Sequence, residues 1–118
     1  MKESIIKNKS KDFALRIIKL YKYLTTTAET REYILSKQIL RSGTSIGANV
    51  KEALRGQSRP DFRAKMNIAL KEASETEYWL ELLHESDYID DASFQSIIED
   101  NIELIKILTN IVKSTDQS

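Results

Sequence analysis

The sequence predicts an all-α fold, an up-down antiparallel four-helix bundle that forms a single domain over residues 1–118. Apolar residues recur about every 3.6 positions almost throughout the chain, and no alternating stretch is long enough to indicate a strand. The 118 residues can enclose one core but not two, and three glycines and one proline leave few helix-breaking positions. Length and composition therefore agree with the periodicity.

Four helices are expected, over residues 11–24, 31–55, 60–85 and 91–113. The polar segment TTTAET, residues 25–30, is long enough to reverse the chain between the first two helices. No internal repeat and no low-complexity segment interrupts this order, so the helices belong to one domain.

Short polar residues mark the beginnings of three helices. Ser10 is the expected N-cap of the first, and Ser58 is that of the third, where Pro60 is tolerated in the first turn. Asp90 or Asp91 is expected to cap the last helix. The expected core faces of these three helices hold Phe13, Ala14, Ile17, Leu20, Tyr21 and Leu24; Phe62, Met66, Ala69, Leu70, Ala73, Leu80 and Leu83; and Phe94, Ile98, Ile102, Ile105, Leu108 and Val112.

The second helix contains a run of small and polar residues, RSGTSIGANVKEA, at 41–53. Its apolar stripe passes through this run without losing phase, which favours continuous helix over a hinge. Two interior glycines cost about 1 kcal/mol each relative to alanine, so close helix packing is expected to offset them. A phosphate-binding loop is disfavoured, because the run follows no strand and lacks the Gly-Lys-Ser/Thr ending. The expected stripe is Leu35, Ile39, Ser42, Ile46, Val50 and Ala53, and the expected packing residues are Gly43, Ile46, Gly47 and Ala48.

A polar seam runs along one edge of the same helix. Its members, spaced by three or four residues, are Gln38, Arg41, Ser45, Asn49 and Glu52. A solvated flank or an internal hydrogen-bond ladder is the favoured interpretation of the seam. A polar contact between subunits is the alternative.

The third and fourth helices carry more apolar surface than one core needs. Such a surplus usually marks a partner surface, and for a chain of this size the expected partner is another copy. For Trp79, the alternative is that it caps the end of the bundle. The expected interface residues are Ile68, Trp79, Leu82, Ile97, Leu104, Ile107 and Ile111.

Charge is distributed unevenly along a chain whose net charge is zero. Residues 1–57 hold 12 Lys/Arg and 5 Asp/Glu, whereas residues 58–118 hold 6 Lys/Arg and 13 Asp/Glu. A basic surface for nucleic acid or two complementary surfaces in an assembly would explain the asymmetry. The expected nucleic-acid residues are Arg16, Lys19, Lys22 and Arg41, although no aromatic residue lies among the first three to stack on bases.

Catalytic and metal-binding patterns are scarce. Glu81 and His84 match the Glu-x-x-His element of di-iron bundles, but His84 is the sole histidine, so one chain cannot supply the second element. No cysteine is present, which excludes thiolate zinc sites. We expect a soluble cytoplasmic protein that is not an enzyme and uses no cofactor, metal or small-molecule substrate, and no segment approaches a membrane span.

Two segments resemble the signature segments of a known family. SGTSIGANVKEA at 42–53 and IALKEASETEYWLELL at 68–83 are similar to those of the four-helix bundle proteins first named for reading frames in intervening sequences of bacterial 23S rRNA genes. The resemblance covers the chain from about Asp12 to Val112. The commonest family form is Ser-Ile-Pro-Ala-Asn followed by Glu-Gly; Ser45, Ile46, Ala48, Asn49 and Glu52 match it, Gly47 replaces Pro, and Ala53 replaces Gly.

This resemblance implies an up-down bundle that assembles as a homopentameric ring, has no catalytic activity and is not a ribosome component. A related accessory protein of diversity-generating retroelements binds nucleic acid and a reverse transcriptase through a strongly basic surface, whereas this chain has a pI near 6.6. We therefore expect a non-enzymatic oligomeric bundle with a structural or interaction role. The alternative is an accessory protein that binds RNA or DNA through a basic face of the first two helices.

Overall fold

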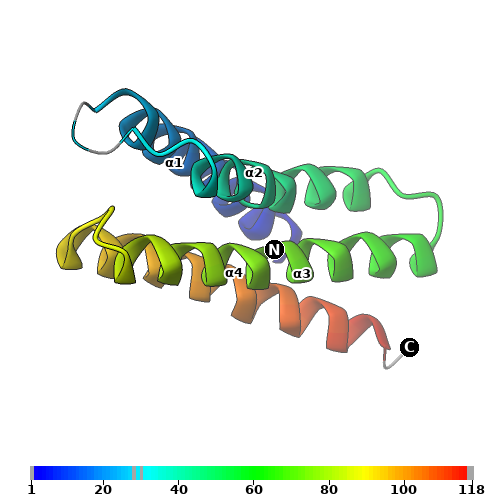
Figure 1. The fold of residues 1–118 in the computed structure, drawn as a ribbon. Coiled ribbons are helices and arrows are strands. Elements are labelled where there is room, and N and C mark those ends of the chain that lie inside the picture. The colour runs from blue at the N-terminus through cyan, green and yellow to red at the C-terminus, as the bar shows by residue number, and fades with distance from the viewer. Residues whose placement is uncertain (1, 28, 30, 117–118) are drawn as a thin grey trace.

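The computed structural model describes residues 2–27, 29 and 31–116, and these residues form four α-helices and no strand (Figure 1). The helices are α1 (Lys2–Thr26), α2 (Leu35–Leu54), α3 (Arg59–Glu85) and α4 (Asp91–Asp116). Consecutive helices run in opposite directions, and the molecule is elongated, 50 × 21 × 19 Å. The all-α prediction is confirmed, and the arrangement fits an up-down bundle. None of the helices is both long and apolar enough to cross a membrane.

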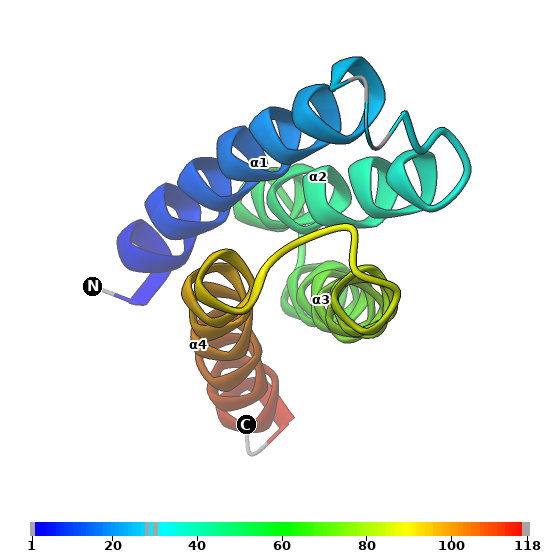
Figure 2. The ribbon, with the colours of Figure 1, turned by 60° about the vertical axis from the view of Figure 1, so that its left-hand side comes forward.

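The helices pack in chain order. α2 lies between α1 and α3, and α4 packs mainly on α3, as the view in Figure 2 shows. α1 and α4 close the bundle with the least extensive contact of the four neighbouring pairs. Their exposed edges are joined by ion pairs from Lys9 to Glu103 and from Arg16 to Asp100.

The beginnings of α3 and α4 agree with their expected caps. The Ser58 hydroxyl oxygen accepts a hydrogen bond from the Asp61 amide at 3.1 Å, and Pro60 lies in the first turn. The Asp90 carboxylate accepts one from the Ser93 amide at 2.7 Å. That bond holds the pKa of Asp90 below its ordinary value.

α1 begins at Lys2, so the prediction of a helix start at residue 11 is wrong. Ser10 lies inside the helix, 1% exposed, and its hydroxyl donates to the Lys7 carbonyl at 3.2 Å. Ile6 is fully buried one turn earlier and continues the core stripe toward the N-terminus. A serine that fills a core position had been interpreted as a cap.

α2 begins at Leu35, four residues later than expected. Arg31 has a positive φ of 38°, which ends the preceding turn. The Glu32 carboxylate then caps the helix, because it accepts hydrogen bonds from the amides of Ile34, Leu35 and Ser36 at 3.1, 3.0 and 2.7 Å. Positions 28 and 30 of the expected 25–30 linker lie outside the described residues, and Thr25 and Thr26 belong to α1.

The core face of α4 agrees with the expected one except at Ile102. Ile98, Leu108 and Val112 are buried, and Phe94 and Ile105 pack against the core. Ile102, expected in the core, is 37% exposed, whereas Asn101 is fully buried. Beside the expected stripe lies a second buried row, formed by Ile97, Asn101, Leu104, Leu108 and Ile111 and spaced 4, 3, 4 and 3. Because this row contains the polar residue Asn101, a search for apolar positions alone selects the neighbouring Ile102 instead.

Candidate functional site

Small residues let α1 and α2 approach each other closely. A Cβ atom added to Gly43 would lie 2.8 and 2.9 Å from the two Cγ atoms of Ile17. One added to Gly47 would lie 3.3 Å from the backbone oxygen of Ser10. Ile46 is fully buried beside them. The fourth expected packing residue, Ala48, is exposed and does not belong to the buried helix contact.

The polar seam of α2 forms a ladder of hydrogen bonds along its own helix. The Ser45 hydroxyl donates to the Arg41 carbonyl at 2.6 Å, and the Asn49 amide group donates to the Ser45 carbonyl at 2.9 Å. Glu52 at the end of the seam pairs with Lys65 of α3 at 3.1 Å. These bonds fit the internal-ladder interpretation of the seam.

Arg41 connects the seam to the neighbouring edge of α3. Its guanidinium pairs with Glu72 at 3.2 Å and with Glu75, which also accepts a hydrogen bond from the indole N–H of Trp79 at 2.9 Å. The Trp79 bond and then the Arg41 bond hold the pKa of Glu75 below its ordinary value. The same contact with Glu75 raises the pKa of Arg41. The bonds orient the indole ring at the surface.

The same edge of α3 carries apolar side chains on both sides of the two glutamates. Ile68, Trp79 and Leu82 share one helical stripe with Glu72 and Glu75, at a spacing of 4, 3, 4 and 3. Ile68 is 40% exposed, and Trp79 and Leu82 are half-buried. We call Ile68, Trp79 and Leu82 the α3 outer edge.

Further apolar side chains lie near one end of this edge. Tyr78 is 54% exposed, and its ring lies 5.3 Å from that of Trp79. Ile34, 76% exposed, directly precedes α2. The pairing of Arg41 with Glu75 sets a register that places the first turn of α2 level with Leu82.

The interface residues expected on α4 lie elsewhere. Ile97, Leu104 and Ile111 are 5%, 1% and 5% exposed and belong to the core of their own chain, so their assignment to an outer surface is wrong. Ile107 is partly buried against the same core. The buried face of α4 is wide enough to include Ile97, Leu104 and Ile111 as well as most of the expected stripe, so these residues are not surplus to the core.

The four expected nucleic-acid residues do not form one open basic face. Arg16 pairs with Asp100 at 2.8 Å and donates to Ser96 of α4, and Arg41 is held by two carboxylates. Lys19 and Lys22 are exposed on α1. The partners of the two arginines lie 31 to 84 residues away in the sequence, so no local pattern could reveal them.

Two buried polar contacts between helices were not expected. The Thr76 hydroxyl of α3 donates to Ser42 of α2 at 2.8 Å, and both residues are fully buried. The Asn101 side-chain amide donates to the Ala73 carbonyl at 3.1 Å, while its Oδ1 atom has no hydrogen-bond partner among the described residues. Such groups favour one helix register over others.

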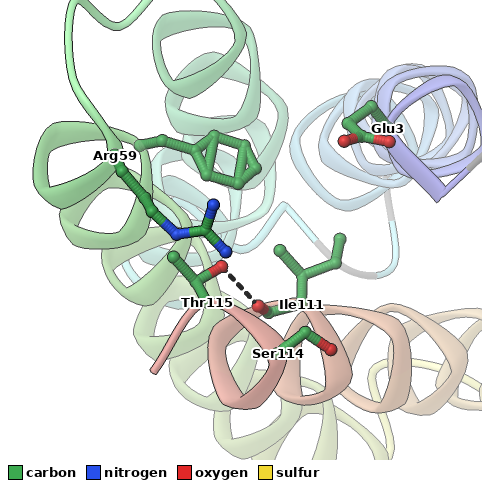
Figure 3. A pocket seen from close by; sticks show the side chains of 6 residues that line it. Glu3, Arg59, Ile111, Ser114 and Thr115 are labelled. Carbon is green, nitrogen blue, oxygen red and sulfur yellow. Dashed lines mark hydrogen bonds between the residues drawn. The ribbon is translucent and has the colours of Figure 1, made fainter. Parts of the chain in front are cut away.

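A cavity of about 430 Å³ lies at the end of the bundle where α1 and α3 begin and α4 ends (Figure 3). Phe62 and Ile111 form its apolar part, and Arg59 and Glu3 bring opposite charges from different helices. In Figure 3 the Thr115 hydroxyl is bonded to the Ile111 carbonyl, at 2.7 Å. The cavity therefore brings together residues from the ends of three helices.

The sole histidine pairs with an acidic residue at the α3–α4 turn. His84 Nε2 lies 2.7 Å from Asp91 Oδ1, and its ring stacks on Phe94 with centroids 4.1 Å apart. Across residues 2–27, 29 and 31–116, no three His, Cys, Asp or Glu side chains gather as a metal site would require.

Comparison with known proteins places the fold within a family. The chain matches the family model of the 23S rRNA-intervening sequence protein over residues 2–110. It is similar to a crystal structure, at 1.70 Å resolution, of a protein with unknown function from the S23 ribosomal protein family of Bacteroides thetaiotaomicron VPI-5482. The two are 56% identical, with a TM-score of 0.92 over 96% of this chain and 99% of that one. No protein of curated function matches the sequence. The chain belongs to the 23S rRNA-intervening sequence protein family.

Proposed function

We propose that this protein is a non-enzymatic homo-oligomer, a structural or interaction protein whose subunits associate through the α3 outer edge. The observation that supports the proposal is the partial exposure to solvent of the apolar side chains Ile68, Trp79 and Leu82 in the single chain. Apolar surface of this kind gains about 25 cal/mol for each Å² removed from water. The proposed partner is a second copy of the chain, because copies of one chain are always present together.

The polar network within the edge would fix the orientation of the Trp79 side chain in the interface. Glu75 and Trp79 are fixed by hydrogen bonds from Arg41 and to each other, so the indole is presented in one orientation. Preorganised aromatic groups are typical anchors of interfaces, because little conformational freedom is lost when they are buried. Ile34 and Tyr78 extend the apolar area near Leu82.

The proposed assembly is a closed ring of five subunits, the form that the family resemblance implies. In a ring each subunit uses two different patches, so the α3 outer edge would meet another surface of the next copy. Family resemblance also supports the absence of catalytic activity.

Sedimentation velocity of paired variants tests the interface. Ile68→Ser with Leu82→Ser should give a smaller species with helical circular dichroism retained, because both side chains lie outside the buried core. Ile5→Ser with Leu15→Ser is the matched control: these α1 residues are 45% and 51% exposed but lie on another helix. Equal sedimentation of the wild type and the α3 variant would contradict the assignment of the interface.

A further inference from the structure

A groove between α1 and α2 is lined by cations from both helices. Lys7 and Lys11 come from α1, and Lys51 and Arg55 come from α2, around a volume of about 520 Å³. All the residues that line the groove are described, and none of them is acidic. Its other members are small residues: Ser10, Ala14, Thr44, Gly47 and Ala48.

Four other basic residues of the bundle have an acidic partner on a neighbouring helix, and the groove cations differ from these four. Lys9, Arg16, Arg41 and Lys65 each form an ion pair with a carboxylate of another helix. For the four cations of the groove, the described part of the chain supplies no such pair. Positive charge is therefore concentrated here without local compensation.

The cations form two short rows that face each other across the groove. Within each row, Lys7 and Lys11 or Lys51 and Arg55, the residues are four apart, about 6 Å along the helix. The close approach of Gly47 to the α1 backbone keeps the two helices, and so the two rows, near each other. Exposed Lys22 lies farther along the same face of α1.

We propose that this groove binds the phosphate backbone of a nucleic acid. Two parallel rows of cations suit an extended chain of negative charges better than a single small anion, which would meet only part of the groove. No aromatic side chain lines it, so stacking on unpaired bases is not provided. We therefore expect sequence-tolerant binding in which duplex binds at least as tightly as single strand.

The site differs from the one that the sequence indicated. Two members of the expected cluster, Arg16 and Arg41, are neutralised by α4 and α3, whereas the α1–α2 groove is open. The inference does not rest on the oligomeric role proposed above. An assembly would only increase the number of grooves.

Fluorescence anisotropy of a labelled duplex of about 20 base pairs, two helical turns, tests the proposal over a salt series. For four phosphate contacts, the logarithm of affinity should fall against the logarithm of salt with a slope of about −3.6, and more steeply if several grooves engage. Lys51→Gln with Arg55→Gln should weaken binding at low salt at least about tenfold and reduce the slope by about 2. Lys71→Gln with Lys106→Gln, exposed on α3 and α4, removes the same charge and should change affinity less than about twofold.

Three results would overturn the proposal. The first is the absence of duplex binding at low salt. The second is equal weakening of binding by the groove variant and by the Lys71→Gln with Lys106→Gln control, which would show that binding depends on overall charge and not on the groove. Binding of the wild type to vesicles containing phosphatidylserine, but not to the duplex, would assign the groove to lipid headgroups. Lys7→Gln with Lys11→Gln provides a second groove variant on the other helix if the first does not fold.

The mass of each variant separates this proposal from the previous one. Loss of duplex binding at an unchanged oligomer mass supports the groove as the site. If the groove variant lowers the mass instead, the occupant is the acidic surface of a second copy, and the nucleic-acid proposal is wrong.

Discussion

Adding one methyl group at Gly43 should destabilise the protein even though alanine favours helix. The new Cβ atom would lie 2.8 and 2.9 Å from the two Cγ atoms of Ile17, well inside the usual 3.5–4.0 Å between carbon atoms. Ile17 is fully buried and β-branched, so its side chain cannot rotate away freely. Overpacking of this kind costs about 1–3 kcal/mol, against a propensity gain of about 1 kcal/mol. We expect a net loss of up to about 2 kcal/mol.

A double-mutant cycle isolates the contact. Ile17→Ala removes both Cγ atoms and leaves only the Cβ atom, 3.2 Å from the added methyl group, so Gly43→Ala in that background should stabilise by up to about 1 kcal/mol, the propensity gain. Ile17→Val keeps both Cγ atoms and should leave Gly43→Ala destabilising. Ala48→Gly, at an exposed position of the same helix, measures the local propensity and should cost about 1 kcal/mol.

Urea denaturation followed by circular dichroism gives these free energies of unfolding. All variants must be compared at one protein concentration, because association would make stability depend on concentration. The predicted coupling energy between Gly43 and Ile17 is about 1–3 kcal/mol. If Gly43→Ala stabilises both backgrounds equally, the α1–α2 crossing is not tight and the packing explanation of the glycines is wrong.

Two further predictions concern carboxylates that hold helices in place. Glu32→Ala should lower the free energy of unfolding by about 0.5–2 kcal/mol, because three amides of α2 lose their acceptor; Glu29→Ala, exposed in the same connection, is the control in urea denaturation. The depressed pKa of Glu75 contributes stability above the ordinary glutamate pKa of about 4.3, and this contribution is lost as the pH falls through the lower folded-state value. Glu75→Gln should therefore flatten the urea midpoint measured against pH in the acid range, whereas an unchanged profile would show that the Arg41–Glu75–Trp79 network is not coupled to folding.

Sequence predicts the helices of this fold because their signals are local. Ser58 and Pro60 fix the start of α3 within one turn of sequence, and the structure agrees. Ser10 misled for the same reason: a serine one turn before an apolar stripe is typical of a cap, but here it is itself part of the stripe. Asn101 had a similar effect on α4, because burial of its amide depends on the Ala73 carbonyl of another helix.

The surfaces were harder to predict, because charge compensation is a property of tertiary structure. Arg16 and Lys11 look equivalent along α1, yet one faces Asp100 and the other faces a groove without acids. The apolar residues expected on the outer surface differ in exposure between the two helices. Ile68 on α3 is exposed, whereas Leu104 on α4 is not.

Light scattering coupled to size-exclusion chromatography tests the central claim, self-association, most directly. The subunit mass is 13.6 kDa, and the proposed ring of five predicts about 68 kDa at micromolar concentration. A stable mass of several subunits would support association even at another stoichiometry. A mass of 13.6 kDa under the same conditions would contradict the account.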